Sequence, residues 1–200
     1  MTVSWTPHRF AGGVLALDVT NTVVLRGDPR RCFDRFADIA ELPRFAEAAS
    51  VQRADELGGR RLEVDDPARA APLVISLREA TDGLFRSAVE SGGLEARLLG
   101  PFLAACAAGV AGSREQLPSA ELALAPGPGP LALETAVAIS ALSLLQPARL
   151  ARLRLCANCR WLFIDGSRNR SRVWCDMAVC GNRQKARRHY RRFREGLDEA

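Results

Sequence analysis

Four cysteines in the last quarter of the chain form two close pairs. Two residues separate Cys156 from Cys159, and four separate Cys175 from Cys180. Fifteen residues lie between the pairs. Thiolates this close in sequence can face one metal ion from a tight turn, and the spacer brings a second turn to the opposite side of the ion. The spacing predicts one structural Zn²⁺ held by these four residues, with two disulfides or four unrelated thiols as the alternative.

The ligand set argues against catalysis at the metal. A catalytic zinc keeps one coordination position for water and usually recruits His or Glu, whereas four thiolates leave no position open. The chain has only two histidines, and it contains no phosphate-binding loop and no nucleophile motif. We therefore expect that the protein is not an enzyme.

Basic residues concentrate around the cysteines. Residues 149–200 hold 14 Arg or Lys and 5 Asp or Glu, a net charge of +9, whereas residues 1–148 hold 14 basic and 18 acidic residues, a net charge of −4. A basic segment on an acidic remainder is typical of proteins that bind polyanions. Because zinc with four thiolates carries −2, some of these arginines are expected to compensate the metal site instead.

The basic segment predicts nucleic acid as the partner. Each phosphate neutralised by Arg or Lys releases counterions, so several contacts give salt-sensitive affinity. Asn182 and Arg183 are residue types that read base edges, but bonding to the thiolates or to the turn backbone is the stronger alternative for them. The predicted contact residues are Arg168, Arg170, Arg172, Asn182, Arg183, Lys185, Arg187, Arg188, Arg191 and Arg192.

The chain shows neither a secretory signal nor a membrane span. Residues 1–10 lack a basic start followed by an apolar core, and the longest apolar stretches, 98–110 and 131–145, are too short to cross a bilayer. We expect a cytoplasmic protein without membrane partners. In that compartment, metal binding is a better explanation of the cysteine pairs than disulfides.

Helical periodicity dominates the first three quarters of the chain. It predicts helices over 38–49, 72–91, 94–110 and 131–145, with Pro72 opening the second, and a short helix over 147–153. A short strand over 58–66 and a strand over 115–124 that continues into a turn at 126–130 are also expected. The apolar segment 10–25 fits either a strand or a helix.

Asp18 and Asn21 lie three residues apart within the apolar segment 10–25. On a helix they would share one face and place two polar groups beside an apolar core. Hydrogen bonding to nearby backbone is the favoured explanation, because most buried polar groups serve structure. The alternative is that Asp18 and Asn21 line a pocket for an unidentified small-molecule ligand.

The segment around the cysteines predicts a compact zinc module. Residues 161–164 and 173–174 have strand composition, with a turn at 165–167, and a helix follows Cys180. Along that helix Ala186, Tyr190, Phe193 and Leu197 form one stripe that we expect to face protein. Trp161, Phe163 and Trp174 are expected to cover the metal site more than to stack on bases.

These patterns predict an α+β protein of 200 residues. A mainly α-helical N-terminal domain with small β-hairpins is expected over residues 1–147, which we name the body. A treble-clef-like zinc ribbon is expected over residues 148–200, which we name the finger. A single finger binds an operator weakly, so a homodimer is expected if the target is a specific DNA site.

The finger resembles the CGNR zinc-finger family, named for the residues that stand here as Cys180 to Arg183. The resemblance rests on Cys156-x-x-Cys159, Trp161-Leu-Phe163, Asp165-x-Ser167-Arg168, Arg172-x-Trp174-Cys175, Met177 and Cys180-Gly-Asn-Arg183. Residues 12–22 resemble the start of the ABATE domain that usually precedes this finger. Val173 departs from the pattern, because a second arginine is expected before Trp174.

The resemblance implies a stress-related bacterial transcription regulator in which the finger binds double-stranded DNA and the body senses a ligand. Two alternatives stay open on the residues alone. The first is an RNA-binding or ribosome-associated module, because a basic finger of this kind also suits RNA. The second is a protein-interaction finger whose arginines only compensate the metal site and keep the chain in solution.

Overall fold

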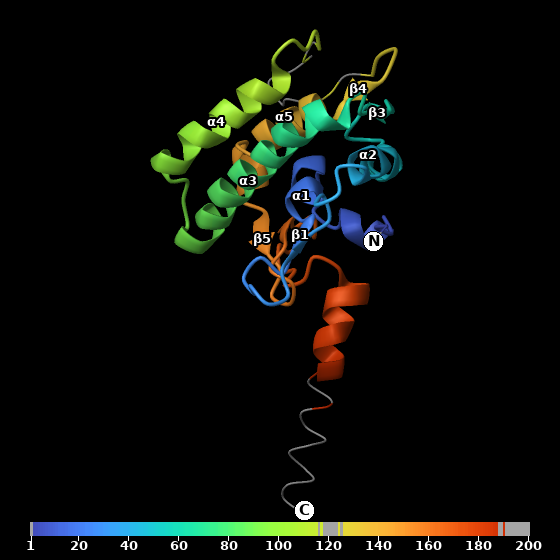
Figure 1. Cartoon of the computed structure of the whole chain (residues 1–200). Coiled ribbons are helices and arrows are strands. Elements are labelled where there is room, and N and C mark those ends of the chain that lie inside the picture. The colour runs from blue at the N-terminus through green and yellow to red at the C-terminus, as the bar shows by residue number, and fades with distance from the viewer. Residues whose placement is uncertain (1, 116, 118–123, 125, 188–189, 191–200) are drawn as a thin grey trace, which may run out of the picture.

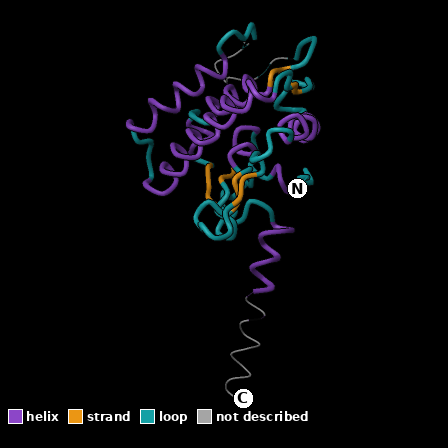
Figure 2. Tube along the Cα trace, in the orientation of Figure 1, coloured by secondary structure: helices purple, strands orange, loops and turns teal. Residues whose placement is uncertain are grey.

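The computed structural model describes residues 2–115, 117, 124, 126–187 and 190. The chain forms an α+β fold in which helices dominate and the sheets are small (Figures 1 and 2). The helices of the body are η1 (Pro7–Phe10), α1 (Leu15–Thr20), α2 (Glu41–Gln52), α3 (Pro67–Ser91), α4 (Ala96–Val110), α5 (Leu133–Ser143) and α6 (Pro147–Leu150). The strands are β1 (Val23–Val24), β2 (Phe33–Asp34), β3 (Leu62–Glu63), β4 (Leu131–Ala132), β5 (Leu153–Leu155) and β6 (Leu162–Ile164).

Three long helices, α3, α4 and α5, pack on one another as their periodicity predicted. Helix α5 packs against both α3 and α4 and buries nearly all of its residues, because apolar side chains lie on every side of it. Gly109 allows α4 to approach: a Cβ there would lie 2.9 Å from Cβ of Ala138 and 2.9 Å from Cδ1 of Leu77. The core of the body therefore sits between these three helices.

Helix α3 begins five residues earlier than the predicted start at Pro72. The carboxylate of Asp66 accepts hydrogen bonds from the amides of Ala68 (2.9 Å) and Arg69 (3.3 Å), which caps the helix, and Pro67 occupies its first turn. Pro72 lies within the helix on its exposed side, so the backbone carbonyl that it leaves unpaired faces water. The N-cap Asp66 followed by Pro67 was therefore a stronger signal for the start of the helix than Pro72.

The ambiguous segment 10–25 contains both kinds of structure. Its first part forms α1, which is buried completely between α5, α3 and β6, and its last part forms β1. Strand β1 pairs with β2 in an antiparallel arrangement. Helix α1 is thus the central element between the body and the finger, although it is only six residues long.

Other short elements follow the predictions in part. Strand β3 forms within 58–66 but pairs in parallel with β4, so the two strands come from distant parts of the chain. Most of the strand predicted over 115–124 lies outside the described residues. Helix α6 ends at Leu150 instead of 153, because residues 153–155 form β5.

The finger shares the core of the body. Leu153 of β5 and Leu162 of β6 belong to the same apolar cluster as α1, α3 and α5. A second, smaller cluster surrounds the cysteines and includes Trp161 and Phe163. The predicted boundary between residues 147 and 148 stays a prediction, and the apolar contacts across it are extensive.

Candidate metal centre

The four cysteine sulfurs converge on one point. One ligand atom from each of Cys156, Cys159, Cys175 and Cys180 lies within 4.8 Å of the other three. The Sγ–Sγ distances of the Cys159–Cys175 and Cys175–Cys180 pairs are both 3.7 Å. A tetrahedron with Zn–S bonds of about 2.3 Å requires sulfur separations of about 3.8 Å, so the geometry fits zinc.

The first cysteine pair sits at the tip of the β5–β6 hairpin. The amide of Cys156 donates to the carbonyl of Trp161 (2.9 Å), and the amide of Arg160 donates back to the carbonyl of Cys156 (2.9 Å). Arg160 takes a left-handed conformation with φ of 62°, which lets the chain reverse within four residues. The two thiols are thereby held on the same side of a rigid turn.

The second pair is organised by Asp176. Its carboxylate accepts from the amides of Ala178 (2.8 Å) and Val179 (3.2 Å) and caps η2, a single π-helical turn at Met177–Gly181. The backbone carbonyl of Asp176 accepts from the amide of Cys180 (2.9 Å). Cys180 therefore stands at the end of one tight turn, directly before the C-terminal helix over 182–187.

The predicted pairing of 161–164 with 173–174 is wrong. Strand β6 pairs with β5 in an antiparallel arrangement, and residues 173–174 form no strand. Val173 instead contacts the first cysteine turn, where the amide of Ala157 donates to the carbonyl of Val173 (3.0 Å). The strand composition of 161–164 was informative, but it carried no information about which segment would be its partner.

Asp165 organises the loop between the two cysteine pairs. Its buried carboxylate accepts from the backbone amides of Ser167 (2.9 Å) and Arg172 (2.9 Å). Burial alone would raise the pKa of Asp165, but the hydrogen bonds from Ser167 and Arg172 outweigh it and lower the pKa to about 2. The loop is therefore held by a charged acceptor and not by a β-turn alone.

Aromatic residues cover the metal site, as the sequence predicted. Phe163 is fully buried, and Trp161 is 4 % exposed. The guanidinium of Arg172 lies over the ring of Phe163, 5.4 Å from its centroid, and donates a hydrogen bond to the carbonyl of Cys175. Arg172 is thus engaged within the finger, unlike its neighbours Arg168 and Arg170, which are exposed.

The described residues place part of the predicted nucleic-acid surface. Arg168, Arg170, Arg183, Lys185 and Arg187 are exposed. Arg187 donates to Oδ1 of Asn158 (3.3 Å). Asn182 donates to the carbonyl of Ala178 (2.9 Å), which stabilises the start of the helix. Three predicted contact residues lie outside the described residues: Arg188, Arg191 and Arg192.

The described part of the apolar stripe on the helix after Cys180 does not pack against the protein. Ala186 is exposed and Tyr190 is 67 % exposed, whereas Phe193 and Leu197 lie outside the described residues. The helix leaves the finger in a direction that carries it away from the body (Figure 1). Within the described residues, Ala186 and Tyr190 therefore pack against no apolar surface, and the amphipathic pattern had no apolar partner there.

Asp18 and Asn21 have protein partners for their polar atoms. Asp18 accepts from the amide of Gly12 (2.9 Å) and from Nε of Arg53 (2.6 Å), while burial raises its pKa to about 6. Asn21 donates to the carbonyl of Leu162 (2.9 Å) and accepts from the amide of the same residue (3.1 Å). The structure favours the structural explanation, and ligand binding at these residues stays a prediction.

Three residues around the metal site had no role in the sequence predictions. Asp176 carried a local signal, since Asp directly before a helical turn is a typical cap. His8 and Arg35 carried none, because they reach the finger from far away in the chain. His8 bonds Asp176, and Arg35 lies over the ring of Trp161 (5.3 Å from its centroid). Cys106 is buried, which raises the pKa of its thiol to about 12, so it is a packing residue and not a reactive thiol.

Comparison with known proteins identifies the finger. Residues 152–193 match the family model of the CGNR zinc finger, and this range includes all four cysteines. No curated protein and no solved structure matches the chain. A zinc finger domain is therefore present, and Cys156, Cys159, Cys175 and Cys180 form the ligand set of one structural zinc ion. Among the described residues, no helix has both the length and the apolar character needed to cross a membrane.

Proposed function

We propose that the protein is a bacterial transcription regulator that binds double-stranded DNA through its finger. The observation that carries the proposal is a contrast in how arginines are paired. In the body, Arg26, Arg60 and Arg78 each form ion pairs with Asp or Glu. In the described part of the finger, Arg160 pairs with Glu90 of the body, whereas Arg168, Arg170 and Lys185 are exposed and form no ion pair.

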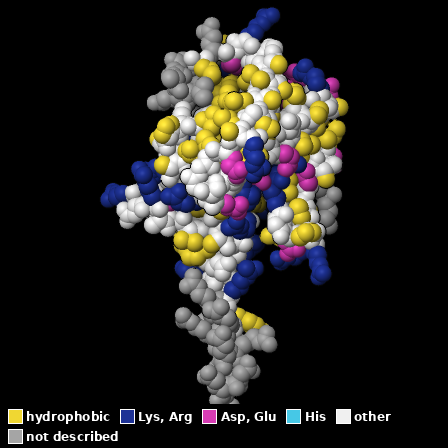
Figure 3. All heavy atoms as spheres, turned by 90° about the vertical axis from the view of Figure 1, so that its left-hand side faces the viewer, with side chains coloured by type: hydrophobic (Ala, Val, Ile, Leu, Met, Phe, Trp, Pro, Cys, Tyr) yellow, Lys and Arg dark blue, Asp and Glu magenta, His cyan; other side chains and the backbone are white. Residues whose placement is uncertain are grey.

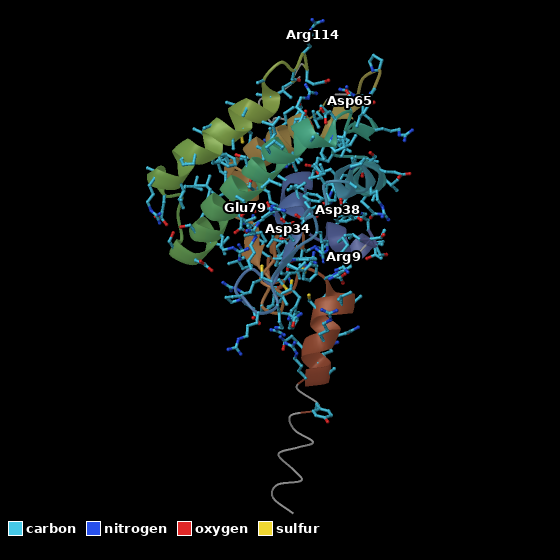
Figure 4. All side chains as sticks on the ribbon, in the orientation of Figure 1. Arg9, Asp34, Asp38, Asp65, Glu79 and Arg114 are labelled. Carbon is cyan, nitrogen blue, oxygen red and sulfur yellow. The ribbon has the colours of Figure 1, made fainter. Side chains whose placement is uncertain are left out.

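The unpaired cations give the finger its affinity for a polyanion. Figure 3 shows Lys and Arg side chains along the start of the C-terminal helix, whereas those at the centre of the same face are interleaved with acids. Asp34 and Glu79, labelled in Figure 4, are acids of the body that form ion pairs with Arg78 and Arg26. Like charges that no acid relieves repel one another, and bound phosphates would remove the repulsion.

The direction of the C-terminal helix favours DNA over RNA. Residues 182–187 stand clear of the body, so Lys185 and Arg187 are accessible from outside the molecule (Figures 1 and 2). A free-standing basic helix fits the major groove of B-form DNA, whereas the deep, narrow major groove of A-form RNA excludes it. Zinc contributes rigidity, because it holds the base of this helix to the hairpin tip.

The body offers one cavity that suits the proposed sensing of a small molecule. It has a volume of about 240 Å³, and Gly13, Val14, Glu56, Ser140, Ser143 and Arg149 are among its lining residues. Glu56 accepts from the amide of Leu15 (2.8 Å) and from the hydroxyl of Ser140 (2.5 Å). Gly13 touches the finger on its other side, because a Cβ there would lie 3.1 Å from Cβ of Ile164. Only Gly13 would therefore separate a ligand in this cavity from β6 of the finger.

Fluorescence anisotropy with three partners tests the DNA proposal. Zinc-loaded protein is titrated into labelled duplex DNA, a structured RNA hairpin and an unstructured acidic peptide at the same ionic strength. We expect binding to the duplex to be tightest, and removal of zinc with a chelator to abolish it. Preference for the RNA hairpin would favour the RNA-binding alternative. Binding to none of the three would favour the protein-interaction alternative.

Native mass spectrometry tests the sensing half of the proposal. Protein purified under mild conditions should carry an additional small mass in a fraction of molecules. The variant Ser140→Ala removes a hydroxyl that lines the cavity and should lose that mass while keeping zinc. Wild-type spectra that show only the chain and its zinc, even after incubation with a metabolite extract, would contradict a ligand in this cavity.

A further inference from the structure

The N-terminal segment lies against the zinc site. Nδ1 of His8 and Oδ2 of Asp176 are 2.8 Å apart, although 168 positions separate the two residues. The ring of His8 stacks on Trp161 with centroids 5.4 Å apart and planes 26° apart. These two contacts fix the position of Arg9, the next residue, at the seam between the body and the finger.

Three guanidinium groups lie at this seam. Arg35 lies over the Trp161 ring on which His8 stacks, Arg9 follows His8, and Arg183 stands at the start of the C-terminal helix. The pKa of Arg9 is lowered by burial and by the charge of Arg183. Burial and the charge of Arg9 lower the pKa of Arg35 to about 10. Among the described residues, no Asp or Glu forms an ion pair with Arg9, Arg35 or Arg183. The seam therefore holds three cations that form no ion pair with an acidic side chain.

The seam also contains buried donors without an acceptor. Nε of Arg9 and Nε1 of Trp161 are both buried, and neither has a hydrogen-bond partner. Figure 4 shows Arg9 on the side of the body that faces the start of the C-terminal helix. Arg183 lies at the start of that helix and is exposed. Unmet donors next to mutually repelling cations are the chemistry of an anion site.

Compensation of the zinc site explains only one of the three arginines. Four thiolates and one Zn²⁺ carry −2. Arg35 is 5 % exposed, and the charge of Cys159 opposes the lowering of its pKa, so Arg35 lies close enough to serve the metal site. Burial and the charge of Arg183 lower the pKa of Arg9, and its buried Nε has no hydrogen-bond partner. Arg9 and Arg183 are thus left for an anion from outside the chain.

We propose that Arg9 and Arg183 hold one backbone phosphate of the bound DNA, with Arg35 behind them. The nucleic-acid surface then crosses from the finger to the N-terminal segment, and the His8–Asp176 contact keeps the two parts of the site in register. This inference rests on the proposed function. The occupant is a phosphodiester, and inorganic phosphate shares its chemistry.

Single and double substitutions test the shared phosphate. Arg9→Gln and Arg183→Gln should each weaken duplex binding at all sequences and reduce the slope of log K against log salt by up to about one. Because both side chains hold the same phosphate, the double variant should lose less affinity than the product of the two single losses. Arg9→Lys should retain most of the slope. Arg69→Gln, an exposed arginine on α3, is the matched control.

The outcomes separate this inference from the proposed function. The reference variant combines Arg168→Gln, Arg170→Gln and Lys185→Gln. If that variant loses duplex binding while Arg9→Gln and Arg183→Gln bind as the wild type does, the seam holds no phosphate and the DNA proposal stands. If the wild type binds no duplex, the proposed function fails first. Zinc content, measured for every variant, shows whether the finger is intact.

Inorganic phosphate distinguishes the two sources of the anion. Phosphate replaces chloride at constant ionic strength, and its competition with duplex DNA is measured for the wild type and for Arg9→Gln. We expect phosphate to compete weakly with the duplex in the wild type and less in the variant. Protection of the wild type by phosphate against thermal unfolding, together with no effect of Arg9→Gln on duplex affinity, would show a free-phosphate site and overturn the inference.

Discussion

The residues at the metal site divide into ligands and supports, and the two groups differed in how well they could be predicted. The cysteines were evident from spacing alone, because a tetrahedral ion demands short ligand pairs. The supports come from elsewhere: Asp176 caps a turn, His8 arrives from the N-terminus and Arg35 from the loop after β2. Only contacts in three dimensions could reveal the last two.

Loss of one ligand should remove the metal. We expect Cys159→Ser to lower the zinc content from about one ion per chain to nearly none, because three thiolates without the fourth bind zinc far more weakly. Metal analysis of the purified variant provides the measurement. Cys32→Ser is the control, since Cys32 is exposed and lies outside the cluster. Full zinc content in Cys159→Ser would show that the ligand set is different.

Asp165 should give the finger an acid-sensitive contribution to stability. Its folded pKa of about 2 lies below the unfolded value of 3.8, so the contribution is complete above about pH 4 and is lost as the pH falls toward 2. At pH 7, Asp165→Asn should reduce the free energy of unfolding by about 1–3 kcal/mol, because two buried amides lose a charged acceptor. Denaturant unfolding of both proteins between pH 7 and pH 3 provides the measurement. If the difference in the free energy of unfolding between the wild type and Asp165→Asn does not shrink below pH 4, this role is contradicted.

The elements were predictable where their pattern was local and not where it depended on a partner. The helices over 67–91, 96–110 and 133–143 follow from periodicity, and Gly92 ends the first of them in a left-handed conformation with φ of 84°. The partner of β6, by contrast, was not predictable from its own residues. Residues 173–174 were expected to be that partner, and β5 is the actual one. The stripe of the C-terminal helix predicted a packed face, although Ala186 and Tyr190 are exposed.

Asn21 is the contact that joins α1 to the finger hairpin. We expect Asn21→Ala to reduce the free energy of unfolding by about 2–4 kcal/mol, since it leaves the amide and carbonyl of Leu162 buried without partners. Proteolysis within residues 156–180 should also accelerate. Thr20→Ala is the matched control, because the hydroxyl of Thr20 bonds only the carbonyl of Ala16. Equal proteolysis of the two variants would show that Asn21 does not dock the finger.

On the scale of the whole molecule, acidic residues prevail in the body and basic residues in the finger, and the two parts differ in how their arginines pair with acids. The acidic balance of residues 1–148 was visible in the sequence, and so was the basic balance of residues 149–200. That Arg26 and Arg78 of the body pair with acids while Arg168 and Arg170 do not is a property of the folded chain. The shared core of body and finger was equally hidden, because the sequence placed Leu153 at the end of a short helix and Leu162 in a strand of the finger, with no sign that both join the core of the body.

The salt dependence of duplex binding tests the central claim, that exposed cations of the finger bind DNA. The affinity of zinc-loaded protein is measured across a range of salt concentrations and compared with that of the Arg187→Glu, Arg191→Glu variant. The control variant combines Arg61→Gln, Arg69→Gln and Arg114→Gln. Arg114 lies at the end of the molecule opposite the C-terminal helix (Figure 4).

The account predicts that log K falls linearly with log salt in the wild type and in the control. In the Arg187→Glu, Arg191→Glu variant, the affinity should drop by at least about tenfold. The slope of log K against log salt should flatten by about two, with zinc content unchanged. Equal slopes in all three proteins would contradict the account, because the affinity would then come from cations outside the finger.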